Sequence, residues 1–147
     1  MKFNLIIDKS KEEEITATVH GRSSLTERIE ALVMQYSGND RIPVFSEDEM
    51  KLLQFSEIES VVSEEGKTFV TDSSGNRFRI KMRLYEIEEI LPSYFIRINK
   101  SALANEKRIE RFSANFSGAV DAVFKSGNKE YVSRRCFAEI KRRYFGK

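Results

Sequence analysis

The stretch Tyr94–Asn105, YFIRINKSALAN, decides how we interpret the rest of the chain. Its first half alternates between outward and inward residues as far as Ile98, as a half-buried strand does. Pro92 fixes the start of this strand, because proline cannot continue the helical pattern ahead of it and has no amide to donate. Three hydrogen-bonding residues, Asn99-Lys100-Ser101, interrupt the apolar pattern before Ala102-Leu103-Ala104 resumes it. On this stretch alone the polar trio is either a loop presented to a ligand or a plain surface turn.

The first 40 residues are expected to form a small β-β-α lobe. Alternating apolar residues predict strands over Lys2–Ile7 and Glu14–His20, joined as a hairpin by a charged link. The sequence Ser24-Leu25-Thr26-Glu27 matches a capping box, and the apolar residues after it fall on one helical face. Gly38 is placed to end that helix. We expect a lobe over residues 1–40 and a second domain over residues 41–147.

From Arg41 the apolar period changes to two, which predicts many short strands separated by turn residues. A short helix is expected from Leu84 to Leu91, and a last helix is expected after Ser133, with Phe137, Ile140 and Tyr144 on its inner face. The fold class is therefore mainly β, with short helices. The predicted strands are Arg41–Phe45, Met50–Phe55, Ile58–Ser63, Lys67–Thr71, Asn76–Ile80, Arg108–Ser113, Ala119–Phe124 and Lys129–Val132.

Charge is divided unevenly along the 147 residues, although the net charge is only +2. Residues 97–147 hold 13 Lys and Arg against 5 Asp and Glu, a balance of +8. Residues 1–96 hold 12 against 18, a balance of −6. Such an asymmetry favours a polyanion, nucleic acid above all, as partner of the second half.

Composition argues against an enzyme, a metal site or a bound cofactor. One His and one Cys supply no zinc-binding spacing and no internal disulfide. No glycine-rich phosphate-binding motif is present, and paired acids such as Glu64-Glu65 are expected to be solvated. No apolar run has the length of a signal peptide or a membrane span, so we expect a cytoplasmic protein without a small-molecule substrate.

Two arginines directly after a helix cap, Ser133-Arg134-Arg135, are unusual. In the first helical turn they face the positive end of the helix dipole. This placement destabilises the helix by about 0.3–1 kcal/mol for each arginine. A phosphate bound there would reverse that cost, because exposed amides and both guanidinium groups favour an anion. Alternatively, both side chains simply extend into water.

Three segments together resemble a known family. LPSYFIRINKSALAN, then RIERF and GNKEYVSRRCFAEIK, are similar to the second half of a LytTR-type DNA-binding domain, and the match runs from about Arg41 to the end. The resemblance implies stacked β-sheets whose loops, and not a recognition helix, enter successive major grooves of double-stranded DNA. The residues ahead of the match are too few for a receiver domain, so the chain looks like the stand-alone branch.

The family's contacting loops can be carried over to positions of this chain. The first corresponds to the Glu64–Thr68 hairpin, with Lys67 or Gly66 at the contacting position. The second is Asn99-Lys100-Ser101, where the family often has His or Asn in place of Lys100, which leaves both a base and a phosphate contact open for it. The third is Arg134-Arg135, with Arg135 the closer match. The family pattern also includes Arg97 and Asn105, and we count both as candidate DNA contacts.

Partners follow partly from the residues and partly from the resemblance. One domain reads a short site, so selectivity predicts a homodimer on DNA that reads two repeats a whole number of helical turns apart. The stand-alone branch is often paired with an inhibitory integral-membrane protein. The alternative function is a β-rich RNA or single-strand binder that stacks bases on Tyr94, Phe95 and Arg97, and competition with duplex DNA distinguishes the two.

Overall fold

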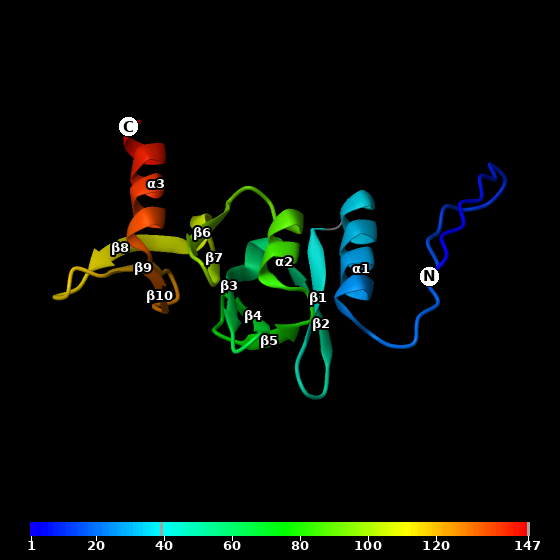
Figure 1. Ribbon diagram of the computed structural model, residues 1–147, viewed down its shortest axis with the longest axis horizontal. Helices are drawn as coiled ribbons and strands as arrows, with labels where there is room; N and C mark the ends of the chain where they lie inside the picture. The colour runs from blue at the N-terminus through cyan, green and yellow to red at the C-terminus, as the bar shows by residue number, and fades with distance from the viewer. Residues whose placement is uncertain (39, 147) are drawn as a thin grey trace.

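The computed structural model describes residues 1–38 and 40–146. Within these residues it contains ten strands and three helices (Figure 1). The helices are α1 (Ser24–Tyr36), α2 (Leu84–Ile90) and α3 (Arg134–Phe145). The strands are β1 (Arg41–Phe45), β2 (Met50–Gln54), β3 (Ile58–Glu64), β4 (Lys67–Asp72), β5 (Arg77–Ile80), β6 (Phe95–Asn99), β7 (Ala102–Asn105), β8 (Ile109–Ala114), β9 (Val120–Phe124) and β10 (Lys129–Val132). The strand-rich class with short helices, predicted from the sequence, is confirmed.

Seven strands form one antiparallel sheet in the order β2-β1-β5-β4-β3-β7-β6. Helices α1 and α2 pack beside this sheet, and their apolar faces close its core. Most neighbouring strands of this sheet are joined by hairpins. In two of these turns Gly66 and Gly75 adopt the positive φ that a tight turn requires. The largest buried members of this first core are Phe55, Ile42, Leu53, Ile58, Ile80, Met82, Ile87 and Leu103.

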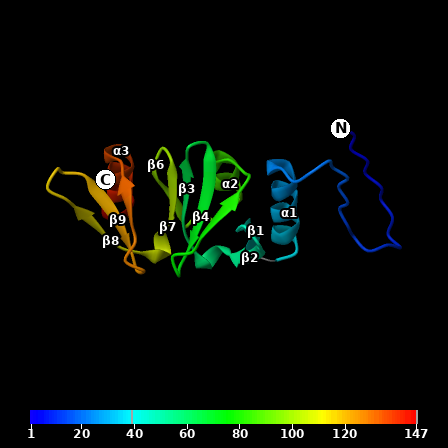
Figure 2. The ribbon, with the colours of Figure 1, turned by 90° about the horizontal axis from the view of Figure 1, so that it is seen from below.

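Three strands form a second sheet in the order β10-β9-β8, which is followed by α3. Its core is shared with β6 and β7, whose small residues Ala102 and Ala104 let the two layers approach closely. Figure 2 shows the two sheets next to each other along the long axis of the molecule. The buried members of this second core are Ile96, Ile98, Ala102, Ala104, Ala122, Phe124, Val132 and Ile140.

Polar bonds fasten the two sheets together at both ends. At one end the Ser133 amide donates to the Ile98 carbonyl at 2.8 Å. At the other, the buried Glu59 carboxylate of β3 accepts from Asn128 Nδ2 at 3.0 Å and from the Ser126 hydroxyl, both in the β9–β10 turn. Because a buried carboxylate is costly without partners, these bonds specify the relative placement of the sheets.

The strands expected over residues 2–7 and 14–20 are not found, and this part of the prediction is wrong. A turn does form, in which the Asp8 carboxylate accepts from the Ser10 amide at 3.0 Å, but the flanking segments carry no strand assignment. They are exposed along their length (Figure 1). The physical reason is that alternation alone supplies no partner strand, and an isolated two-stranded hairpin is marginal in water.

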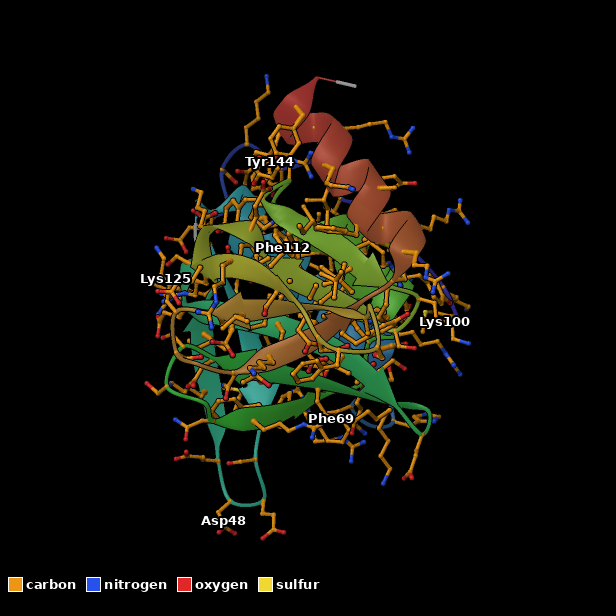
Figure 3. All side chains as sticks on the ribbon, turned by 90° about the vertical axis from the view of Figure 1, so that its left-hand side faces the viewer. Asp48, Phe69, Lys100, Phe112, Lys125 and Tyr144 are labelled. Atoms are coloured by element: carbon orange, nitrogen blue, oxygen red, sulfur yellow. The ribbon has the colours of Figure 1, made fainter. Side chains whose placement is uncertain are left out.

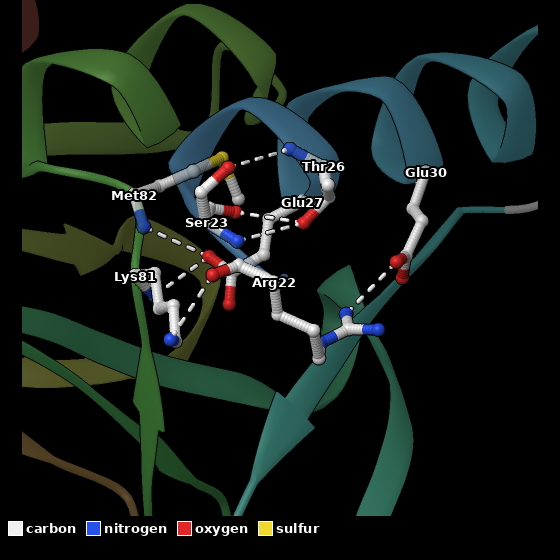
Figure 4. Close-up of polar contacts among 7 residues, drawn as sticks. All are labelled: Arg22, Ser23, Thr26, Glu27, Glu30, Lys81 and Met82. Carbon is white, nitrogen blue, oxygen red and sulfur yellow. Dashed lines mark hydrogen bonds and ion pairs between the residues drawn. The ribbon is translucent and has the colours of Figure 1, made fainter. Parts of the chain in front are cut away.

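Helix α1 begins one residue earlier than the capping motif suggested (Figure 4). Ser23 is the cap, since its hydroxyl accepts from the Thr26 amide at 3.4 Å and Thr26 Oγ1 accepts from the Ser23 amide at 2.9 Å. Glu27 therefore takes no part in the capping box, contrary to the motif in the sequence. Its buried carboxylate reaches across to the β5–α2 link and accepts from the amides of Lys81 and Met82 at 2.6 and 2.8 Å.

These bonds attach α1 to the sheet, and Ala31 on the same helix is buried in the first core. The domain boundary near residue 40 stays a prediction. At the other end of the chain, Phe137 and Ile140 of α3 face inward as expected, whereas Tyr144 is mostly exposed. No helix in the described part of the chain has the length and apolarity to cross a membrane.

Candidate nucleic-acid interface

Three segments that are far apart in the sequence meet at one end of the molecule. The Ser63 amide donates to the Ser101 carbonyl at 2.8 Å, which places the β3–β4 turn beside the β6–β7 turn. The bond from Ser133 to Ile98 places the start of α3 beside the β6–β7 turn as well. We call residues 64–67, 99–101 and 133–135 the loop end. In Figure 3 it lies on the side of Lys100, with Lys125 on the opposite side.

The β3–β4 turn holds Lys67 in the open. Glu65 and Gly66 both have positive φ, 51° and 75°, as a type I′ hairpin turn requires. Glu64 pairs with Arg77 at 2.7 Å, so this carboxylate is engaged away from the turn. Lys67 is exposed, and its cation is available to a ligand at the loop end.

The β6–β7 turn is organised by Asn99. Its carbonyl oxygen accepts from the Ser101 amide at 2.7 Å, while its Nδ2 donates to the Tyr131 carbonyl of β10 at 2.7 Å. An Asx turn of this kind fixes the backbone without a regular ladder. Lys100 at the tip is exposed, and the Ser101 side chain is half-buried beside it.

The start of α3 carries the two arginines as the sequence predicts. Ser133 is the N-cap, and its hydroxyl accepts from the Cys136 amide at 3.2 Å. No acidic residue lies in the first turn, so nothing neutralises the positive end of the helix locally. Arg134 is exposed, and the Arg135 side chain is 91% exposed with only a 3.9 Å contact to Glu139. Together with Lys67 and Lys100 they make the loop end cationic and suited to phosphate.

Comparison with known proteins supports the same interpretation. The pattern of the LytTr DNA-binding domain matches residues 48–144, about two thirds of the chain. The chain belongs to this family. Proteins from Staphylococcus aureus strains MSSA476 and MW2, both called uncharacterized HTH-type transcriptional regulators, are each 29% identical over 147 residues and align with 97% of both chains.

A solved structure shows the same fold. It is described as the LytTr DNA-binding domain of a methyl-accepting/DNA response regulator from Bacillus cereus. The TM-score is 0.65 at 22% sequence identity, and the alignment covers 75% of this chain and all of that one. At this identity the likeness concerns the fold alone. The LytTr fold is thus shared by the two proteins.

The Arg97 side chain is bonded within the LytTr fold itself. Its guanidinium makes two bonds to the Glu88 carboxylate, at 2.7 and 3.3 Å, and a third to the Lys100 carbonyl at 2.8 Å. A bidentate pair of this geometry is among the stronger side-chain interactions. Arg97 therefore positions the β6–β7 turn against α2, and its charge is already largely matched.

Asn105 does not lie on the surface. It is 1% exposed, its Nδ2 donates to the Ile58 carbonyl at 2.9 Å, and its carbonyl oxygen accepts from the Lys107 amide at 3.0 Å. Both polar ends are satisfied inside the protein, as buried amides require. We therefore assign Asn105 to the fold and withdraw it from the candidate DNA contacts.

The stacking platform that a single-strand binder needs is not available on β6. Tyr94 and Phe95 pack against the first core with their ring centroids 5.2 Å apart, and Lys107 lies over the Tyr94 ring at 4.3 Å. Burial raises the pKa of the Tyr94 hydroxyl. With Arg97 engaged as well, this alternative loses the residues on which it rested.

A fourth segment at the loop end escaped the sequence analysis. The turn Asn115–Ala119 between β8 and β9 projects past the Ala114–Val120 pair, and Val120 also pairs with Val132, immediately before Ser133. The turn therefore lies at the same end as the start of α3. Its sequence, Asn-Phe-Ser-Gly, is ordinary turn chemistry, and only the aromatic residue within it was a signal.

Proposed function

We propose that this protein is a cytoplasmic transcription regulator that reads a specific duplex DNA site through the loop end. Family membership supports DNA binding, and the names of its staphylococcal relatives support regulation of transcription. The observation that carries the loop mechanism is the meeting of three segments, far apart in the sequence, at one end of two joined sheets, where they bring Lys67, Lys100, Arg134 and Arg135 to one surface. Loops held by a rigid scaffold can present side chains to base edges within the tolerance that recognition needs.

Roles follow from how each residue is held. Arg135 is the best candidate for a base contact, because the Ser133 cap fixes its backbone while its planar fork stays free for a guanine edge. Lys67 and Lys100 are suited to either phosphate or guanine, since both are exposed at hairpin tips. Asn99 and Ser101 act chiefly by shaping the turn that carries Lys100.

The test begins with selection of a binding site from random duplexes by the full-length protein. Arg135→Ala should then cost about 1–3 kcal/mol on the selected duplex and relax preference at one base pair. Arg142→Ala, a matched loss of an exposed arginine at the far end of α3, should cost less and equally on a scrambled duplex. Lys100→Ala distinguishes its two roles, since loss on every sequence indicates phosphate and loss on the selected site alone indicates a base. Equal losses for Arg135→Ala on both duplexes would contradict base reading.

Two partner proposals accompany this function. Binding as a homodimer to two repeats would supply the selectivity that one short site lacks. Control by an inhibitory membrane protein rests on the resemblance to stand-alone family members. The N-terminal segment of residues 1–20 is the surface offered to either partner, because its apolar side chains are exposed.

A further inference from the structure

The β8–β9 turn presents an aromatic ring to solvent for which the fold has no use. Phe116 is fully exposed and belongs to neither core. A Phe normally stabilises a fold by burying its ring, and a ring exposed to water contributes no such stabilisation. A single exposed ring at the tip of a projecting hairpin therefore marks a contact surface when other features point the same way.

Several hydrogen bonds close the turn that carries this ring. The side-chain oxygen of Asn115, Oδ1, accepts from the Ser117 amide at 3.0 Å, from the Ser117 hydroxyl at 2.6 Å and from the Ala119 amide at 3.2 Å. The Asn115 amide donates to the Ala119 carbonyl at 2.9 Å, and Gly118 takes a φ of 83° that a side chain would disfavour. These bonds define the backbone on either side of Phe116, so binding would order the side chain and little of the turn.

A groove of about 420 Å³ separates this turn from α3. The turn supplies Ser117 and Gly118 to one wall, and α3 supplies Arg134, Phe137 and Lys141 to the other. The helix residues are spaced three, four and seven apart, so they share one face. Val120 and Val132 are apolar members of the lining, and Arg134 and Lys141 make the helix wall cationic.

We infer that the β8–β9 turn and this face of α3 form a fourth DNA contact, beyond the three loops. Arg134 and Lys141 hold the phosphates of one strand along the groove, while Phe116 packs on the deoxyribose and base edges of the adjoining minor groove. The proposal rests on the function proposed above, because it extends that interface.

Continuity and charge both favour duplex DNA as the occupant. The turn lies beside Ser133 through the pairing of Val120 with Val132, so a duplex on the loop end passes it. The two cations of the groove suit a polyanion, whereas the turn itself is uncharged and can add only apolar contact. Apolar side chains that press on minor-groove sugars and base steps are an established way to hold a bent duplex.

The experiment compares variants on the duplex selected by the wild-type protein, with its flanks kept. Phe116→Ala should weaken binding about tenfold, as expected when a phenyl ring loses partial burial, and leave the salt slope unchanged. Lys141→Ala should instead make the slope shallower by roughly 0.9 for its phosphate. Hydroxyl-radical protection of the sugars at one end of the site should disappear only with Phe116→Ala. The thermal midpoint should not move, because the ring touches nothing in the fold.

A spectroscopic variant supplies an independent reading, since the chain has no Trp. The emission of Phe116→Trp should be quenched and shifted by the selected duplex, and that of Tyr85→Trp, an exposed aromatic site on α2, should not change. Unchanged affinity and sugar protection for Phe116→Ala overturn the proposal. So does unchanged affinity for a single-site duplex with lost cooperativity on two sites, because a second copy would then be the occupant. Failure of the wild-type protein to prefer any duplex would overturn the proposed function as well.

Discussion

At the scale of single residues, Glu27 shows how one carboxylate can be bound into the fold. Its side chain is buried, and one oxygen accepts two backbone amides while Oε2 has no hydrogen-bond partner within the described residues. Burial raises the pKa of Glu27 above its ordinary value, and Glu30 acts in the same direction, whereas the two amides and Arg22 lower it. The charged form is therefore the costly one in the folded state.

A pH dependence of stability follows from that sign. A raised pKa means that the folded state holds the Glu27 proton more tightly than the unfolded state does. The contribution of this proton to the unfolding free energy is therefore fully present below about pH 4.5, the ordinary pKa of a Glu carboxyl. It is lost as the pH rises through the pKa of the folded state. Glu27→Gln removes this group. The unfolding free energy of the variant minus that of the wild type should therefore increase from acid to neutral pH, as urea unfolding at a series of pH values can measure. Glu89→Gln, at an exposed position of α2, is the control, and a difference for Glu27→Gln that is constant with pH would contradict the prediction.

At the scale of elements, the β6–β7 turn depends on one asparagine for two separate tasks. The Asn99 side chain closes the turn on Ser101 and ties it to the Tyr131 carbonyl of the second sheet. Asn99→Ala removes both bonds and should lower the unfolding free energy by about 1–3 kcal/mol. DNA affinity should fall by the same factor on every DNA sequence, because the whole turn loosens.

Lys100→Ala is the matched control, since its side chain is exposed at the tip of the same turn. It should leave the denaturation midpoint unchanged and affect DNA binding alone. An Asn99→Ala protein of wild-type stability that loses affinity for the selected site only would show that Asn99 reads a base directly.

The strands from Arg41 to Val132 other than β7 were predictable from the sequence to within one or two residues, because alternation and turn chemistry are local signals. For β7 the sequence showed only that the apolar pattern resumes at Ala102. The Ser133 cap was predictable for the same reason. The hairpin over residues 2–20 was not, since a strand needs a partner that the local pattern does not name. Asn99 and Asn105 look alike in sequence, yet one shapes a surface turn and the other is buried under Ile58. The pairing of β7 with β3 brings Asn105 to the Ile58 carbonyl, and the local sequence does not reveal that pairing.

At the scale of the whole molecule, the N-terminal region divides at the start of α1. Helix α1 contributes the buried Ala31 and the Glu27 bonds to the main body. Residues 1–20 lie outside both cores, and six of their large apolar side chains are more than 60% exposed: Met1, Phe3, Leu5, Ile6, Ile7 and Ile15. The proposed lobe of residues 1–40 therefore contains one part that the fold needs and one part that is free for a partner.

Two truncations separate these parts. Deletion of residues 1–20 should change the unfolding free energy by less than about 0.5 kcal/mol, because exposed segments contribute little. Deletion of residues 1–38 should cost on the order of several kcal/mol, since it opens the first core beside β1 and leaves the Lys81 and Met82 amides without an acceptor. The shorter deletion is thus the one that can test assembly.

If residues 1–20 join two copies on DNA, the shorter deletion should leave the affinity for a single repeat intact and abolish cooperative binding to two repeats. The measurement is a titration of one-repeat and two-repeat duplexes, with the complex mass determined at saturation. The wild-type protein should form a 2:1 complex on two repeats with steeper binding than on one. The truncated protein should reach the same 2:1 stoichiometry with independent sites, because each loop end still reads its own repeat. Cooperativity that survives the deletion would move the contact between copies to another surface, and a 1:1 complex of the wild-type protein on two repeats would contradict the dimer itself.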